Sequence, residues 1–218
     1  MSIKTINRHL NTVTYQYAGP GSTTPYVQVN YETYNIKTQF GCAAVGEYSA
    51  SSVPLVRSVN LPDGTSYTFQ YETSSGSSVT GRISQIGLPT GGKITYQYTG
   101  GSGGIDCADG TTAGLTRTTP DGQWTYTRSN TTSVTSTATG ITTTILDPAL
   151  NQTVYTFSDG YETERQTFNG TTTVLSTTKT CYNGNFANCV SASITGQILR
   201  KDAYTTPSGG QTRLSETF

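Results

Sequence analysis

Few side chains in this sequence have the types and spacing that catalysis needs. His9 is the single histidine, so a Ser-His-Asp triad would have to use it, and no G-x-S-x-G motif is present. Two pairs of carboxylates, Asp106 with Asp109 and Glu162 with Glu164, are candidates for glycoside hydrolysis. Both pairs lie in polar, loop-like sequence, where solvation or turn formation explains them. We therefore expect a chain that is not an enzyme and has no catalytic or cofactor-binding residues.

Four cysteines offer a second kind of chemistry. Cys181 and Cys189 frame the short loop CYNGNFANC, and a disulfide there is worth about 2.5 kcal/mol on the loop-entropy model. Cys42 and Cys107 would then pair across a longer span, although four cysteines allow three connectivities and the sequence does not choose among them. A zinc site needs about four His or Cys ligands at suitable spacing, which these cysteines lack. The even count, beside Gly- and Asn-rich loops, favours disulfides over four free thiols in a reducing cell, and with them a secreted or cell-surface location.

The charge of the chain limits its partners. The net charge is zero, only 12% of the residues are charged, and the basic residues are scattered. Phosphate binding needs clustered Lys and Arg, so nucleic acid is excluded as the main partner. No apolar stretch approaches the ~18–20 residues of a membrane span, and we expect no membrane insertion. The N-terminal segment lacks the apolar region of a signal peptide, but both ends lie in strand-like sequence and look cut from something longer.

The composition points to strands as the elements that must position any site. Thr and Tyr suit a pleated surface and are abundant, with 15 Tyr and 24 Gly in the chain, while helix-forming residues are scarce. Hydrophobic residues make up only 33%, so the core must come largely from aromatic rings. Each buried ring covers roughly 150–250 Å², worth roughly 4–6 kcal/mol as an upper estimate. The expected fold class is therefore all-β.

An internal repeat organises the strands. Turn-like blocks begin at Pro62, Pro89, Pro120, Pro148 and Pro207, and their spacing gives a repeat of about 28–30 residues, with the last gap near two periods. In each block Pro presets the backbone for a tight turn, and a following Asp-Gly or Gly-Gly supplies positive φ. A turn of this kind between two alternating runs predicts an antiparallel β-hairpin.

Aromatic residues follow the first four turns, whereas Leu214 and Glu216 take their places after Pro207. The aromatic residues usually fall seven and nine residues after the proline, and residues two apart share one face of a strand. Trp124 and Tyr126 lie only four and six residues after Pro120. A turn shorter by one residue would place them on the same face as the other aromatics. The pairs at the usual positions are Phe69 with Tyr71, Tyr96 with Tyr98, and Tyr155 with Phe157.

These motifs resemble a known family. The run from Gly81-Arg82-Ile83 through Pro89 and Gly91 to Tyr96 and Tyr98 resembles the RHS/YD repeat of bacterial polymorphic toxins, insecticidal toxin-complex proteins and teneurins. PDGTSYTFQY matches the second half of that unit. DPALNQTVYTF looks like the variant that opens on Asp-Pro, with Leu150 where Gly is more usual.

The resemblance implies a fold and a role. Repeats of that family form a long curved sheet that spirals into a hollow shell around a C-terminal toxin or effector, and the partners would be the remainder of the same large polypeptide and this cargo. The family's self-cleaving core motif is not visible here, no cargo domain follows, and the hairpins are too few to close a shell. The chain would thus be a fragment, with imperfect hairpins in residues 1–54 and YD-like repeats in residues 55–218. The residues expected to build the repeats are Pro62, Asp63, Gly64, Phe69, Tyr71, Gly81, Arg82, Pro89, Gly91, Tyr96, Tyr98, Pro120, Asp121, Gly122, Trp124, Tyr126, Pro148, Tyr155 and Phe157.

Two other functions remain open. Tyr and Trp on a Thr-rich sheet could bind sugars, which would make the chain a β-rich cell-surface adhesin or carbohydrate-binding module with glycan partners. A hydrolase that uses loop carboxylates is the third hypothesis. The structural role predicts aromatic rings packed on one face of a continuous sheet. Sugar binding predicts a cluster of solvent-facing rings beside polar loops, and hydrolysis predicts two carboxyl groups converging in a cleft.

Overall fold

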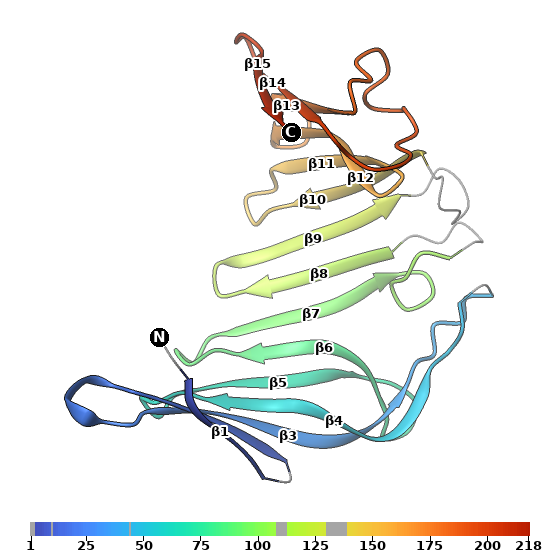
Figure 1. Ribbon diagram of the computed structural model, residues 1–218. Coiled ribbons are helices and arrows are strands. Elements are labelled where there is room, and N and C mark those ends of the chain that lie inside the picture. Colours follow the sequence, from blue (N-terminus) through green and yellow to red (C-terminus); the bar gives the residue numbers. More distant parts are fainter. Residues whose placement is uncertain (1–2, 10, 44, 108–112, 130–138) are drawn as a thin grey trace. The chain divides into compact units, whose positions relative to one another are not determined.

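The computed structural model describes residues 3–9, 11–43, 45–107, 113–129 and 139–218 (Figure 1). Within these residues the chain forms strands and a single short 3-10 helix, η1, so the all-β class of antiparallel hairpins is confirmed. The elements are β1 (Ile3–His9), β2 (Thr12–Tyr17), η1 (Pro20–Ser22), β3 (Tyr26–Lys37), β4 (Ser49–Asn60), β5 (Ser66–Thr73), β6 (Val79–Gly87), β7 (Lys93–Gly100), β8 (Ala113–Thr119), β9 (Gly122–Ser129), β10 (Thr139–Leu146), β11 (Gln152–Ser158), β12 (Tyr161–Asn169), β13 (Thr173–Tyr182), β14 (Lys201–Pro207) and β15 (Arg213–Thr217).

The strands belong to two compact units, which are described separately. Unit 1 comprises Met1–Gln39, Gly46–Gln97 and Arg117–Pro120, and unit 2 comprises Phe40–Val45, Tyr98–Thr116 and Asp121–Phe218. Within each unit, neighbours in the sequence pair as antiparallel strands, from β1 to β7 in unit 1 and from β9 to β15 in unit 2. The boundary between residues 54 and 55, expected between imperfect and regular repeats, lies within β4.

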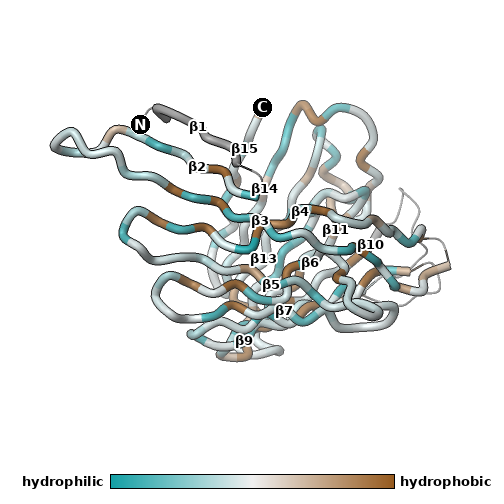
Figure 2. Tube along the Cα trace, turned by 90° about the horizontal axis from the view of Figure 1, so that it is seen from below, coloured by the Kyte–Doolittle hydropathy of each residue, from teal (hydrophilic) through white to brown (hydrophobic). Residues whose placement is uncertain are grey.

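In unit 1, rows of apolar side chains alternate with rows of polar side chains, and each row runs across neighbouring strands. Residues directly opposite each other in an antiparallel pair share one face of the sheet. The apolar row runs across four strands as Val13, Val29, Val59 and Tyr67. The neighbouring polar row runs as Thr12, Asn30, Ser58 and Thr68. Figure 2 shows the same alternation as short brown stretches separated by teal and white ones along the strands.

Hydrogen bonds link the polar side chains from strand to strand. Thr12 Oγ1 donates to Asn30 Oδ1 at 3.2 Å, and Asn30 Nδ2 donates to Ser58 Oγ at 3.0 Å. In unit 2 the hydroxyl groups of Thr178 and Thr205, which lie opposite each other, are 3.0 Å apart. Such cross-strand pairs contribute roughly 0.2–1 kcal/mol each, so a Thr-rich face stabilises the sheet beyond its backbone hydrogen bonds.

Three of the repeat turns have the same backbone. The turns at residues 61–65, 88–92 and 147–151 each close with two hydrogen bonds, in which the first residue donates to the carbonyl of the fifth and the fourth donates to the carbonyl of the first. The fourth residue has positive φ in all three turns, at 83° in Gly64, 87° in Gly91 and 62° in Leu150. Leu150 therefore occupies the left-handed position that favours Gly, as the comparison of the blocks suggested.

The third turn is shorter than its relatives. Only Pro120 and Asp121 separate β8 from β9, where the other three turns have five residues. The sequence predicted a turn shorter by one residue, and the turn is shorter by three. Both numbers are odd, and side chains alternate with a period of two, so either change puts Trp124 and Tyr126 on the same face as the other repeat aromatics. Tyr126 lies opposite Ile145, and Ile145 lies opposite Thr153, so Tyr126 shares its face with Tyr155.

Successive turns touch through a proline and a glycine. A Cβ atom added at Gly92 in unit 1 would lie 3.0 Å from Pro120 Cγ, and one added at Gly122 in unit 2 would lie 2.9 Å from Pro148 Cγ. Each proline ring thus packs on the glycine of the preceding repeat turn. These two contacts leave little room for a side chain at Gly92 or at Gly122.

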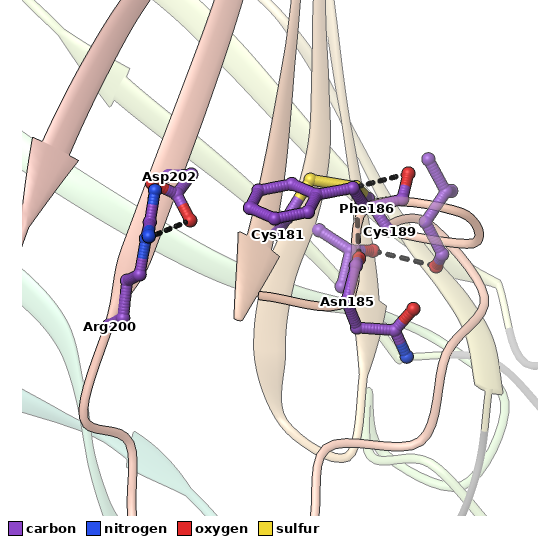
Figure 3. Close-up of a disulfide and its surroundings, with 8 residues drawn as sticks. Cys181, Asn185, Phe186, Cys189, Arg200 and Asp202 are labelled. Atoms are coloured by element: carbon purple, nitrogen blue, oxygen red, sulfur yellow. Dashed lines mark hydrogen bonds and ion pairs between the residues drawn. A yellow bond between two sulfur atoms is a disulfide. The ribbon is translucent and has the colours of Figure 1, made fainter. Parts of the chain in front are cut away.

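Unit 2 carries two disulfides. Cys42 joins Cys107 with 5.6 Å between the Cα atoms, and Cys181 joins Cys189 with 4.6 Å. The second staples the connection between β13 and β14, in which the Phe186 ring lies beside the disulfide (Figure 3). This connection is anchored on the sheet, because Ser158 Oγ donates to the carbonyl of Ala192 and Thr163 Oγ1 to that of Val190.

Full burial is rare in the part of the chain that the structure describes. The buried apolar side chains there are Ile36, Cys42, Val79, Cys107 and Cys181. Most other apolar side chains of the described residues are half-buried. None of the described residues forms a helix long and apolar enough to cross a membrane.

The proline–glycine contact predicts a steric cost. We expect Gly92→Ala to lower the free energy of unfolding by about 1 kcal/mol, because the new methyl group overlaps the Pro120 ring. Gly46→Ala is the matched control, since a Cβ atom there meets nothing within 4 Å and Gly46 does not have positive φ. Urea unfolding monitored by Trp124 fluorescence measures both variants, and equal stabilities would contradict the contact.

The disulfides should differ in their contribution to stability. Replacing Cys42 and Cys107 with Ser opens a loop of 65 residues and should cost about 4 kcal/mol, against about 2.5 kcal/mol for Cys181 and Cys189 with a separation of 8. Thermal unfolding of the two double variants under oxidising conditions tests the order. In a reducing buffer the wild type and both variants should unfold at nearly the same temperature.

Candidate functional site

Two of the carboxylates considered for hydrolysis, Asp106 and Glu162, are engaged in structural contacts. Asp106 Oδ2 lies 3.0 Å from Arg128 Nε, and Asp106 Oδ1 accepts a hydrogen bond from the Ala113 N–H at 2.7 Å. Glu162 Oε1 lies 2.9 Å from Arg165 Nη2, while Glu164 lies opposite Lys179 in the next strand. Asp106 and Glu162 thus each pair with an arginine.

The remaining candidates for chemistry offer no cluster. Asp109 lies outside the described residues, and of His9 the structure gives only its place in β1. Among the side chains that are described, no group of three or more His, Cys, Asp and Glu gathers as metal ligands.

The repeat aromatics lie half-buried on one face of each sheet. Phe69 lies opposite Ile86, Ile86 lies opposite Ile94, and Tyr96 is two residues along the same strand, so these rings share a face in unit 1. In unit 2 the rings of Tyr155 and Phe157 are stacked with centroids 6.4 Å apart, and the Arg165 guanidinium lies 5.5 Å from the Tyr155 centroid. The structure thus brings the expected aromatics together in rows.

Arg82, from the Gly-Arg start of the repeat, holds β5 to β6. Its Nε and Nη2 atoms donate to the two carboxylate oxygens of Glu72 at 2.8 Å each, and Glu72 also accepts from Thr80 Oγ1 at 2.6 Å. Both charged side chains are largely buried, with exposed fractions of 20% and 25%. A bidentate pair in that setting is stronger than an exposed one, and it fixes the end of the β5–β6 hairpin.

The sheet of unit 1 forks between β4 and β5. These two strands pair only from Ser58–Thr68 to Asn60–Ser66. Beyond that point β4 stays with β3 as far as Ser49, whereas β5 stays with β6 as far as Thr73. In Figure 1 the paired β3 and β4 curve away at the end near their connecting loop.

The two arms of the fork meet again at their tips. Ile36 of β3 pairs in parallel with Val79 of β6, and both side chains are buried, with exposed fractions of 6% and 8%. Gly81, another residue of the repeat motif, lies beside this closure, since a Cβ atom there would be 3.8 Å from Ile36 Cδ1. The separated strands therefore enclose an opening in the sheet, bounded at one end by the β4–β5 pairing and at the other by Ile36 and Val79. We call this opening the fork pocket.

The fork pocket has a volume of about 620 Å³. That volume falls within the range of small-molecule sites, roughly 300–1,000 Å³. Its wall combines two tyrosine rings with amide, hydroxyl and charged groups. The lining residues are Glu32, Tyr34, Arg57, Ser58, Asn60, Ser66, Thr68, Phe69, Gln70, Tyr71 and Val79.

The two tyrosines are held in place inside the pocket. Their rings meet edge to face with centroids 5.3 Å apart, a preferred aromatic geometry. Tyr71 Oη donates to the carbonyl of Val56 on the free edge of β4 at 2.6 Å, and Tyr34 Oη donates to Glu32 Oε2 at 2.8 Å. Burial raises the pKa of the Tyr71 hydroxyl. It also raises the pKa of Tyr34 to about 12, with the Glu32 carboxylate as the next cause.

An arginine–carboxylate pair stands at the pocket's rim. Arg57 Nη1 lies 2.7 Å from Glu32 Oε2, with side-chain exposed fractions of 64% and 42%. Arg57 is the extra residue of a β-bulge, because Ser58 lies opposite Asn30 and Val56 lies opposite Tyr31. A bulge re-aims the side chain it carries. A pair this exposed is worth about 0–1 kcal/mol, so a ligand can compete for its hydrogen bonds at little cost.

The sequence did not single out Glu32, Tyr34 or Arg57. The segment YVQVNYETYNIK does alternate, which marks a strand, but it lies in the part that matched the repeat weakly. A β-bulge at Ser84, between the pairs Gln70–Gln85 and Tyr71–Ile83, likewise has no counterpart in the repeat pattern. The fork depends on such register shifts, which leave no readable pattern in one strand.

Comparison with known proteins adds no assignment. A scan of the sequence against protein-family models finds no match, and a search of the curated proteins finds none either. The resemblance to RHS/YD repeats therefore stays a prediction that rests on the motifs.

The raised pKa of Tyr34 predicts a loss of stability at high pH. An ordinary tyrosine titrates at 10.0, so between pH 10 and about 12 the unfolded chain releases this proton while the folded chain keeps it. The contribution is complete below pH 10 and declines as the pH rises through that window. Urea unfolding at a series of pH values should show a shallower decline in Tyr34→Phe than in the wild type. An identical decline in both proteins would contradict the assignment.

Proposed function

We propose that this chain is a non-catalytic structural segment of an RHS/YD-like repeat protein, and that it contributes to a β shell that encloses or displays a C-terminal toxin or effector. The observation that carries the proposal is the common backbone of the turns at residues 61–65, 88–92 and 147–151. A sequence repeat that reproduces one hydrogen-bond pattern three times is typical of an array built from one hairpin unit.

Contacts between neighbouring repeats also support an array. Each proline ring on the preceding glycine links one turn to the next, at Gly92–Pro120 and at Gly122–Pro148. Such contacts connect only nearest neighbours, as in other repeat proteins, so the number of hairpins is free to vary. The partners in this proposal are further hairpins of the same polypeptide and its cargo.

The location proposed is outside the cytoplasm. Two disulfides are compatible with an oxidising compartment, where such bonds persist. A thin sheet with few buried side chains gains most from covalent links of this kind.

The coding region on both sides of this segment tests the proposal. We expect further hairpin units with the Pro-x-Gly turn, followed by an unrelated C-terminal domain. In the purified full-length protein that domain should resist protease longer than it does in isolation, because the shell shields it. Unrelated genes on both sides, or equal cleavage rates of the free and attached domain, would overturn the shell role.

A further inference from the structure

We propose that the fork pocket binds a neutral hexopyranose unit of a glycan. The inference goes beyond the structural role and does not depend on it. It rests on the fork pocket, which is formed wholly within unit 1 by β3, β4, β5 and the start of β6.

The pocket's groups match the two surfaces of a pyranose. A sugar ring presents hydroxyl groups around its edge and C–H groups on its faces. Asn60 and Gln70 supply amide groups that both donate and accept, and Ser58, Ser66 and Thr68 supply hydroxyl groups that do the same. The rings of Tyr34 and Tyr71 supply the apolar surface against which C–H groups pack. A few convergent polar groups beside aromatic rings are the usual composition of a small-molecule site.

The charge of the pocket selects a neutral sugar. Glu32 and Arg57 are the charged residues of its lining, and they neutralise each other at 2.7 Å. An acidic sugar that bonded to Arg57 would bring its carboxylate close to that of Glu32, and the two negative charges would repel each other. A neutral sugar can instead accept from the guanidinium and donate to the carboxylate while the pair stays intact.

The pocket is formed before any ligand arrives. Tyr71 is fixed by its hydrogen bond to the Val56 carbonyl, and Tyr34 by its hydrogen bond to Glu32. The pairing of Ile36 with Val79 closes the far end of the pocket. Rings that need no ordering on binding lose little conformational entropy, which favours a weakly interacting ligand such as a single sugar. The cavity of about 440 Å³ over the turns at Gly64 and Gly91 lacks aromatic side chains and is a poorer candidate.

Saturation-transfer difference NMR on the purified chain tests the proposal with defined probes. The neutral probes are the methyl glycosides of glucose, galactose and mannose, the acidic probe is methyl glucuronide, and the zwitterionic probe is glycine. We expect a signal from at least one neutral glycoside and weaker or no signal from methyl glucuronide and glycine. No signal from the neutral glycosides, or a stronger one from either of the other two probes, would overturn the inference.

Paired variants locate the binding. Gln70→Ala should weaken binding of the neutral glycoside about tenfold, because it removes a hydrogen-bonding amide from the pocket wall. Gln97→Ala is the matched control, since Gln97 is an exposed glutamine in unit 1 that does not line the pocket. Both variants should keep the wild-type melting temperature. Equal affinity in the two variants would overturn the site, while a failed shell experiment would leave this result standing.

Discussion

Antiparallel pairing between consecutive hairpins is the interaction on which the rest of this structure depends. The described residues bury few apolar side chains completely, so no thick core holds the strands in place. Each strand is instead held by the backbone hydrogen bonds to its neighbours in sequence. Because a shift of one residue would exchange the two faces of a strand, correct register is what creates the apolar and polar rows.

Side-chain contacts across strands strengthen that pairing where a core is missing. The hydroxyl groups of Thr and Ser and the amide groups of Asn form hydrogen-bonded rows across the strands. The ion pair of Arg82 with Glu72 holds the end of the β5–β6 hairpin together. Asp202 shows the same principle in unit 2, where its fully buried carboxylate lies 2.9 Å from Arg200 Nε (Figure 3). Asp106 and Glu162, two of the carboxylates considered for hydrolysis, are paired with arginines in the same way.

The fork pocket arises where pairing is interrupted. β4 and β5 part after three residue pairs, and a bulge at Arg57 turns a charged side chain toward the opening. The backbone edge exposed by the separation is partly satisfied by the Tyr71 hydroxyl, which donates to the Val56 carbonyl. The interrupted pairing between β4 and β5 thereby forms a cavity lined by side chains. A fully paired sheet of this composition would present only a shallow surface.

Local signals in the sequence determined much of this protein. The Thr- and Tyr-rich composition determined the class. The Pro-x-Gly blocks determined where hairpins turn, and period-two spacing determined which rings share a face, because turn geometry and strand alternation act over a few residues. Tertiary structure alone decided that the third turn is three residues shorter than the others and that a bulge falls at Ser84. It also decided that Ile36 meets Val79, and so that Glu32, Tyr34, Arg57 and Tyr71 surround one cavity. Those features depend on pairing between residues far apart in the chain, and the alternation of a single strand carries no record of its partner's register.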